Sequence, residues 1–304
     1  MRLEELAPRL VGLTTDDRPA AVGCSGGPDS VALLHLARHV GLEPVAVHVD
    51  HGLRAGSDTE ADVVADQARQ LGVPFVAETA RVSPGPNLAA RARDARYAAL
   101  ERARIGRGAA VTLVGHTADD QAETVLLNLL RGSAAAGLGG MPVRRGTLVR
   151  PLLGIRRAET EALCATLGVA PLRDPTNDDT TLRRNWIRAE VLPLLSAGSE
   201  RDLVPVLARQ AELLRAESEY LDELAVAAWP ANDAADAHAL EALPPVLARR
   251  AVRRWLGPPP PSLADVERVL AVAAGTCRAT EVSGGRRVER HRGQLRVGRG
   301  TVSR

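Results

Sequence analysis

The sequence predicts an α/β fold, with a parallel sheet in the first part of the chain and a smaller, mainly helical part after it. Up to about Pro151, short apolar runs that end in glycine or a polar residue alternate with longer, helix-like runs. This alternation is typical of strands and helices wound into a parallel sheet. The apolar runs are nearly continuous, which indicates strands that are buried on both faces.

The predicted elements follow one another in a regular order. Strands are expected at 20–23, 45–49, 75–77 and 110–114, and helices at 31–40, 59–71, 87–104, 118–130, 155–167 and 183–195. Long helices are expected from Glu200 onward, where Ala, Leu, Glu and Arg dominate. The proline run at 258–261 ends a helix, Ser262 can cap the next one, and residues 281–297 predict a small hairpin. The simplest division is two domains, at 1–198 and 199–304.

The composition is that of an ordinary globular protein, with 45% hydrophobic and 25% charged residues among 304 and a net charge of +2. Every basic side chain other than histidine is arginine, which reflects either a GC-rich genome or a use of arginine for phosphate contacts. Three scattered cysteines fit a reducing compartment. Because no signal peptide or membrane span is recognisable, we expect a cytoplasmic protein without a membrane partner.

The strongest motif is the hexapeptide Ser25-Gly26-Gly27-Pro28-Asp29-Ser30, between the first predicted strand and the first predicted helix. A glycine-rich turn at a helix N-terminus points backbone N–H groups and the positive end of the helix dipole at an anion. Ser25 and Ser30 add hydroxyl donors. Asp29 repels phosphate, so it needs a metal ion, a backbone amide or a nucleophile as partner. The alternative is a capped helix after a tight turn, with Asp29 on the dipole.

Further segments accompany this loop along the first 195 residues. They are Val49-Asp50-His51-Gly52-Leu53-Arg54, Gly115-His116-Thr117-Ala118-Asp119-Asp120-Gln121-Ala122-Glu123-Thr124, Leu130-Arg131-Gly132-Ser133, Gly137-Leu138-Gly139-Gly140-Met141, Asp174-Pro175-Thr176-Asn177 and Arg184-Asn185-Trp186-Ile187-Arg188. The hexapeptide is similar to the signature of the PP-loop ATP pyrophosphatases. Together the segments resemble the tRNA(Ile)-lysidine synthetase family over about residues 18–195.

The resemblance implies a reaction and its participants. ATP, with Mg²⁺, adenylates the C2 oxygen of the wobble cytidine in a tRNA(Ile) with a CAU anticodon, and pyrophosphate leaves. Free L-lysine then displaces AMP to give lysidine, and the tRNA reads AUA instead of AUG. Residues 1–198 would be the catalytic PP-loop domain, and 199–304 would position the tRNA. The oligomeric state stays open, with a homodimer among the alternatives.

The catalytic candidates gather where predicted strands end, which is where open α/β sheets bind ligands. Asp120 and Glu123 share a helix face, and such a face can hold Mg²⁺ or the ammonium of lysine, or it can be an ordinary solvated face. We expect Asp29, Asp120, Glu123, Arg96 and His116 to be catalytic, with Asp29 and Asp120 on the metal. A lone histidine such as His116 is as often structural, and Thr117 stands where the family has a second histidine.

The remaining candidates are binding residues. The ATP site is expected to consist of Ser25, Gly26, Gly27, Asp29, Ser30 and Asp50, although Asp50 could as easily cap a turn. Arg93, Asn177, Arg184, Asn185 and Arg188 are expected to contact substrate or RNA, since arginine forks bind phosphate. Arg93 and Arg96 could instead form a solvated basic face, and Asn177 could fix its loop through turn hydrogen bonds.

Three rival functions are compatible with parts of the sequence. A tRNA thiolase needs cysteines that carry sulfur or hold a cluster, and the sequence has no CxxC pair. An amide-forming synthetase usually needs an ammonia-supplying partner or domain. A non-catalytic nucleotide-binding or RNA-binding protein would differ from an enzyme in releasing no pyrophosphate.

Overall fold

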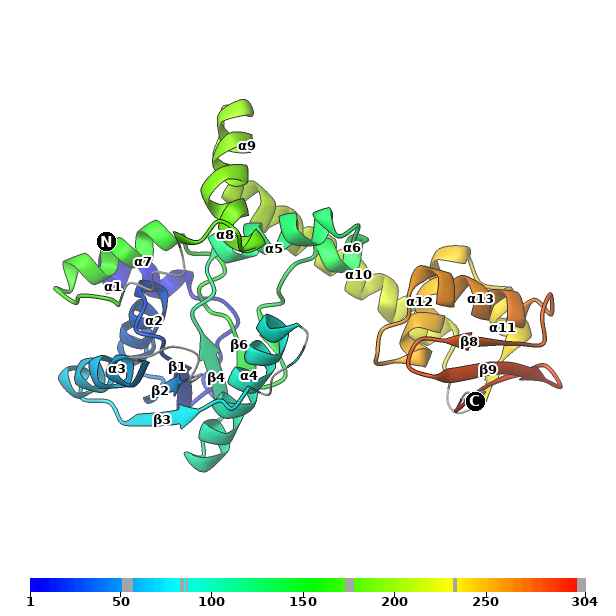
Figure 1. Ribbon diagram of the computed structural model, residues 1–304, viewed down its shortest axis with the longest axis horizontal. Helices are drawn as coiled ribbons and strands as arrows, with labels where there is room; N and C mark the ends of the chain where they lie inside the picture. Colours follow the sequence, from blue (N-terminus) through cyan, green and yellow to red (C-terminus); the bar gives the residue numbers. More distant parts are fainter. Residues whose placement is uncertain (51–56, 83–84, 86, 173–177, 232–233, 300–304) are drawn as a thin grey trace. The chain divides into compact units, whose positions relative to one another are not determined.

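The computed structural model describes residues 1–50, 57–82, 85, 87–172, 178–231 and 234–299. By its internal contacts the chain forms two units, Met1–Arg215 and Ala216–Arg304 (Figure 1). Each unit has a sheet and a hydrophobic core of its own. In the described part of the chain, no helix is long and apolar enough to cross a membrane.

The first unit is built on a six-stranded sheet in the order β3-β2-β1-β4-β6-β5. Five strands are parallel, and β5 runs antiparallel to β6 at one edge. The strands are β1 (Ala20–Gly23), β2 (Pro44–Asp50), β3 (Phe75–Thr79), β4 (Val111–Val114), β5 (Arg144–Arg145) and β6 (Leu148–Val149). The four predicted strands are therefore confirmed. The short pair β5–β6 was not predicted, because two residues are too few to form a recognisable pattern.

Helices cover both faces of this sheet, as the apolar strands predicted. The core on one face joins the strands to residues of α1, α2, α3 and α7, and the core on the other face joins them to α4 (Figure 1). The bounds are α1 (Leu3–Leu6), α2 (Pro28–His39), α3 (Ser57–Leu71), α4 (Leu88–Gly106) and α7 (Arg157–Thr166). The arrangement leaves the carboxyl ends of β1, β2, β4 and β6 along one edge of the sheet.

A separate helical layer closes the first unit beyond that edge. α5 (Ala118–Leu130) packs against the π-helical turn Ile187–Val191, the start of α9 (Leu192–Gly198) and the start of α10 (Leu203–Ala228). The short helices α6 (Ala135–Leu138) and α8 (Arg183–Trp186) lie beside α5. The helix predicted at 183–195 is thus confirmed as a nearly continuous helical segment that contains one wide turn.

The second unit combines helices with a sheet. α11 (Ala237–Glu241), α12 (Pro245–Leu256) and α13 (Leu263–Ala273) share an apolar core with the strands. As predicted, Ser262 caps α13, and its hydroxyl accepts the N–H of Asp265 at 3.1 Å. The hairpin predicted at 281–297 is part of a larger antiparallel sheet, β7-β10-β9-β8, made of β7 (Ala234–Asp236), β8 (Ala279–Val282), β9 (Arg286–His291) and β10 (Gln294–Arg299). β7 pairs with β10 from far away in the chain, which local sequence does not reveal.

Candidate active site

The hexapeptide 25–30 connects β1 to α2, as its sequence predicted. Gly26 has φ +81°, a conformation that favours glycine, and Gly27 occupies the N-cap of α2. Ser30 folds back over the turn, where its hydroxyl donates to the carbonyl of Gly27 at 2.9 Å and accepts the N–H of Ser25 at 3.2 Å. No side chain caps the start of α2. The N-terminus of this helix is therefore open to an anion.

The turn that follows β4 packs directly on this loop. A Cβ atom on Gly115 would lie 2.9 Å from the backbone carbonyl of Asp29 and 3.1 Å from the nitrogen of Ser30, so only glycine fits there. Thr117 then caps α5 through a capping box, since its N–H and hydroxyl reach Oδ2 of Asp120 at 2.9 and 3.1 Å. The residue that departs from the family pattern is thus a buried helix cap. The contact brings the first turns of α2 and α5 together.

Between these helices lies a group of six side chains, the paired cluster, in which three carboxylates face three guanidinium groups. Its members are Asp29, Asp120, Glu123, Arg157, Arg184 and Arg188. Asp29 and the pair Asp120 and Glu123, which follow two different predicted strands, are brought together as expected. Buried charges require partners of this kind, because an unpaired one costs several kcal/mol, on the order of 3–5.

Arg157 holds the three carboxylates together. Its guanidinium lies 3.3 Å from Asp29, 3.1 Å from Asp120 and 3.4 Å from Glu123. Burial lowers the pKa of Arg157, but the three carboxylates outweigh burial and raise it. Sequence reasoning missed Arg157 because it belongs to α7, which is predicted as an ordinary helix and reaches the site only through its packing against α2.

The environment of Asp29 perturbs its carboxyl group. Burial raises its pKa to about 6, and the neighbouring Asp120 acts in the same direction, while the Thr160 hydroxyl and Arg157 oppose them. Thr160, also on α7, donates to the Asp29 carboxylate. A carboxyl group with this pKa changes charge close to neutral pH, as groups in active sites often do.

Glu123 is fully buried and serves as the common partner of two arginines. Arg184 donates to it at 2.6 Å and Arg188 at 2.7 Å. Arg184 also reaches Oδ1 of Asp120 at 3.3 Å. Arg184 and Arg188, which were expected to contact substrate or RNA, therefore both point at the carboxylates.

A second group, the arginine–tyrosine cluster, consists of Arg93, Arg96, Tyr97 and Arg150. The guanidinium carbons of Arg93 and Arg96 lie 5.0 and 5.4 Å from the centre of the Tyr97 ring. Arg150 follows β6, is almost fully buried and donates to the carbonyl of Pro142 at 2.8 Å. Burial of Tyr97 favours its neutral form, but Arg93, Arg96 and Arg150 outweigh burial and lower the pKa of the phenol.

His116 lies beside this second cluster. Burial, followed by the charges of Arg96, Arg150 and Arg93, holds the pKa of its imidazole well below the ordinary value, so the ring is neutral at pH 7. Its Nδ1 is buried and has no hydrogen-bond partner among the described residues. No hydrogen bond from the described residues therefore holds that nitrogen of the ring in place.

The other predicted residues are more dispersed. Asp50 is the last residue of β2, at the same edge of the sheet, and its carbonyl accepts the N–H of Ala80 at 2.7 Å. Asn185 is buried and donates to the carbonyl of Asp179 at 2.9 Å. Asn177 lies outside the described residues.

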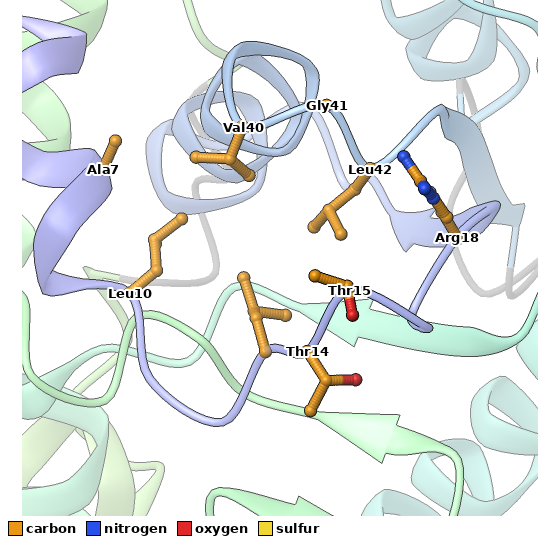
Figure 2. Close-up of a pocket in the computed structure, with 9 residues that line it drawn as sticks. Ala7, Leu10, Thr14, Thr15, Arg18, Val40, Gly41 and Leu42 are labelled. Carbon is orange, nitrogen blue, oxygen red and sulfur yellow. The ribbon is translucent and has the colours of Figure 1, made fainter.

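A cavity of about 450 Å³ lies at the opposite end of the sheet (Figure 2). It is lined by the N-terminal segment, including Leu10 and Thr14, by Arg18 and by the turn Val40–Leu42. Because Arg18 precedes β1 and Leu42 precedes β2, the cavity faces the amino ends of the parallel strands. It is therefore separate from the candidate active site.

The parallel sheet with an open phosphate loop after β1 defines an ATP-using enzyme of the PP-loop class. Residues 2–195 match the family described as PP-loop domain, and residues 236–296 match the TilS substrate binding domain. The chain belongs to the tRNA(Ile)-lysidine synthase family, as its motifs predicted.

Individual comparisons agree with this membership. The chain is 47% identical to the tRNA(Ile)-lysidine synthase of Nocardia farcinica over 78% of its length and 74% of that protein. It is 42% identical to the corresponding Salinispora tropica enzyme over 92% and 90% of the two chains. Among solved structures it resembles the U34-tRNA thiolase NcsA from Methanococcus maripaludis, with a TM-score of 0.59 and 18% identity over 70% of this chain and 78% of that one. This last likeness concerns the fold alone.

Proposed function

We propose that this protein modifies tRNA(Ile) with a CAU anticodon in two steps, adenylation by ATP and substitution by L-lysine. The product is lysidine at the wobble position, with AMP and pyrophosphate released, and the tRNA then reads AUA instead of AUG. The observation that carries the proposal is the open phosphate loop beside buried carboxylates, in a chain of the tRNA(Ile)-lysidine synthase family.

In the first step, the C2 oxygen of cytidine attacks the α-phosphorus of ATP, and the bond to the β-phosphate oxygen breaks. The loop 25–30 supports this step, because its open helix N-terminus can hold the pyrophosphate portion as it leaves. Arg96 lies at the same edge of the sheet, and an arginine fork there can stabilise charge that develops on phosphate oxygens. Neutral His116 can donate or accept a hydrogen bond without adding charge.

Mg²⁺ fits the chemistry of the site, since Asp29 and Asp120 supply oxygen ligands and already share one cation, the guanidinium of Arg157. Together with phosphate oxygens of ATP, these two carboxylates would hold the ion. When bound, Mg²⁺ would neutralise charge on the leaving pyrophosphate. Arg157 would then have to give up at least one of its carboxylate contacts.

In the second step, the ε-amine of lysine attacks C2 of the adenylated base, the bond from C2 to the AMP oxygen breaks, and the amine loses a proton. The ammonium form, with its ordinary pKa of about 10.4, must be deprotonated first. Asp120 is the group that we assign to bind it and accept the proton, because its side chain retains 12% exposure whereas that of Glu123 has none. Glu123 acts as a positioning residue that holds Arg184 and Arg188.

The substrate tRNA would meet both parts of the chain. The family match at 236–296 supports a tRNA-positioning role for the C-terminal domain, proposed at 199–304. Its arginines suit phosphate contacts, which fix position rather than read sequence. In the catalytic domain, proposed at 1–198, Arg93 is our candidate for a contact with substrate, and Arg184, Asn185, Arg188 and Asn177 remain further candidates.

A tRNA thiolase is one rival, because the chain shares its fold with a solved thiolase. Sulfur transfer requires a reactive thiolate or cluster ligands. Cys24 and Cys164 are buried, and burial raises their pKa values to about 12 and about 11, respectively. These two thiols are therefore poor nucleophiles, and the exposed Cys277 belongs to the second unit. The first unit thus has no cysteine suited to carry sulfur, which favours lysine transfer over thiolation.

The test is incorporation of radiolabelled lysine into tRNA(Ile) with a CAU anticodon, with and without ATP. We expect ATP-dependent label in the wobble nucleotide, with AMP and pyrophosphate formed in equal amounts. The elongator tRNA(Met) that carries the same anticodon is the matched control and should stay unlabelled. Pyrophosphate release without label would support adenylation at the loop 25–30 but would contradict the assignment of lysine as the second substrate.

A further inference from the structure

The arginine–tyrosine cluster differs from the paired cluster in the balance of its charges. Among the described residues, Arg93, Arg96 and Arg150 form no ion pair with a carboxylate. They nevertheless lie close together, because Arg93 and Arg96 both lie over the Tyr97 ring and Arg150 also approaches the Tyr97 side chain. Like charges gathered in a partly buried place are unfavourable until an anion joins them.

The cluster also contains polar atoms that lack partners. The Nε atoms of Arg96 and Arg150 and the hydroxyl of Tyr97 are buried and make no hydrogen bond of ordinary geometry among the described residues, although both arginines approach the Tyr97 side chain. Buried polar groups are nearly always satisfied in proteins. Arg150 is only 4% exposed, so its unpartnered Nε lies in the protein interior and is not a solvated surface group.

The geometry suits a ligand with several anionic oxygens. The Tyr97 ring holds the guanidinium groups of Arg93 and Arg96 at 5.0 and 5.4 Å, as expected for cation–π contacts. Arg150 approaches from the end of β6, which adjoins β4 and therefore His116. The positive charge of three guanidinium groups is larger than one carboxylate can balance. A phosphate group carries more acceptor oxygens, to which several arginine side chains can donate.

We propose that Arg150 and Tyr97 complete, with Arg93 and Arg96, a subsite for a phosphate group that is separate from the phosphate loop. The proposal rests on the proposed function, in which two molecules carry phosphate to this edge of the sheet. The group belongs either to ATP or to the RNA backbone beside the wobble cytidine. Arg150 supplies a fork fixed to the carbonyl of Pro142, and Tyr97 keeps the other two forks in place.

The experiment measures binding of ATP and, separately, of tRNA(Ile) to the full chain carrying Arg150→Gln, Arg150→Lys or Tyr97→Phe. Arg102→Gln is the matched control, because Arg102 lies on the same helix and is paired with Glu78 at 3.0 Å. Loss of one charge-assisted phosphate contact should weaken the affected ligand by about 10-fold to 100-fold. Arg150→Lys should recover part of this loss, and the control should match the wild type.

The two sources of phosphate give different results. If the group is in the RNA, the slope of log affinity for tRNA against log salt concentration should fall by about 0.7 in Arg150→Gln. If it is in ATP, the dissociation constant of ATP should rise without tRNA present, and the salt slope should not change. Either result supports the subsite. Both are binding measurements that need no catalysis, so they can be interpreted even if the protein does not form lysidine.

Three results would overturn the proposal. The first is wild-type binding of both ligands by a folded Arg150→Gln protein. The second is a rise in the KM of lysine alone, which would assign the cluster to the lysine carboxylate. The third is equal loss of melting temperature and binding in the glutamine and lysine variants, which would make Arg150 structural. If Arg150→Gln does not fold, Arg93→Gln at the partly exposed side of the cluster gives the same salt-slope test.

Discussion

Two groups of arginines meet at one edge of the sheet, and they differ in what balances their charge. In the paired cluster, Arg157, Arg184 and Arg188 face three carboxylates. In the arginine–tyrosine cluster, the described residues supply an aromatic ring and one backbone carbonyl, that of Pro142, but no carboxylate. The comparison teaches that the arginine charges of the first group are balanced by carboxylates of the chain, whereas those of the second group are balanced only when an anion binds.

The largest effect should come from removing the acid that two arginines share. Glu123→Ala leaves Arg184 and Arg188 without their main partner, so we expect the free energy of unfolding to fall by about 3–5 kcal/mol and lysidine formation to be lost. Urea unfolding followed by circular dichroism measures the free energy of unfolding. Glu101→Ala is the control, since this exposed partner of Arg104 should matter by less than about 1 kcal/mol. Equal losses in the two variants would contradict the distinction between a buried and an exposed pair.

A somewhat smaller loss is expected when the shared cation is removed. Arg157→Gln leaves Asp29 and Asp120 without their common guanidinium, and we expect about 2–4 kcal/mol of destabilisation in metal-free buffer. Added Mg²⁺ should then restore more stability in the variant than it adds to the wild type, because the ion no longer competes with Arg157. Arg156→Gln is the neighbouring control, as Arg156 pairs with Asp119 and Asp202 instead. If Mg²⁺ does not change the melting temperature of Arg157→Gln, the assignment of Asp29 and Asp120 as a metal site is wrong.

The raised pKa of Asp29 makes stability depend on pH with a definite sign. Between the unfolded value of 3.8 and the folded value of about 6, the folded protein binds more protons than the unfolded chain. Stability contributed by the protonated group is therefore present at low pH and lost as pH rises through about 6, by at most about 3 kcal/mol. Asp29→Asn should lack this loss, so its stability relative to the wild type should increase from pH 4 to pH 7. Parallel pH profiles in metal-free urea titrations would show that the carboxyl group is not perturbed.

The smallest effect should distinguish the arginine–tyrosine cluster directly. Sulfate at ten times its Kd should stabilise the wild type by about 1.4 kcal/mol if it fills this cluster. The response should shrink in Arg150→Gln and persist in Arg102→Gln, as measured by thermal unfolding. Because the phosphate loop is unchanged in both variants, any sulfate bound there contributes equally. The same response in all three proteins would place sulfate elsewhere.

Local sequence was sufficient for much of the fold. The helix at 118–130 has the predicted bounds, because Thr117 and Asp120 form a capping box that the residues specify by themselves. The loop 25–30 lies where predicted, because glycine at positive φ and proline at the first helical position fix its path. In the second unit, by contrast, a predicted hairpin is one part of a four-stranded sheet, since strand pairing across long separations leaves no local pattern.

The candidate site was predicted less completely than the fold. Asp29, Asp120 and Glu123 could be named because they stand in or beside recognisable motifs, and the sheet brings them together. Arg157 and Thr160 could not, because they lie on a helix that reaches the site only by packing on α2. Arg150 was missed for a similar reason, since it follows a two-residue strand.

The sequence by itself determined the class of fold, the phosphate loop and the family, because these depend on patterns within a few neighbouring residues. Only the tertiary structure decided which charges balance one another. Every basic side chain apart from histidine is an arginine, so residue type cannot separate the arginines that hold carboxylates from those left for a ligand. That separation is made by crossover connections and helix packing, which place Arg157 against three acids and Arg150 beside a tyrosine.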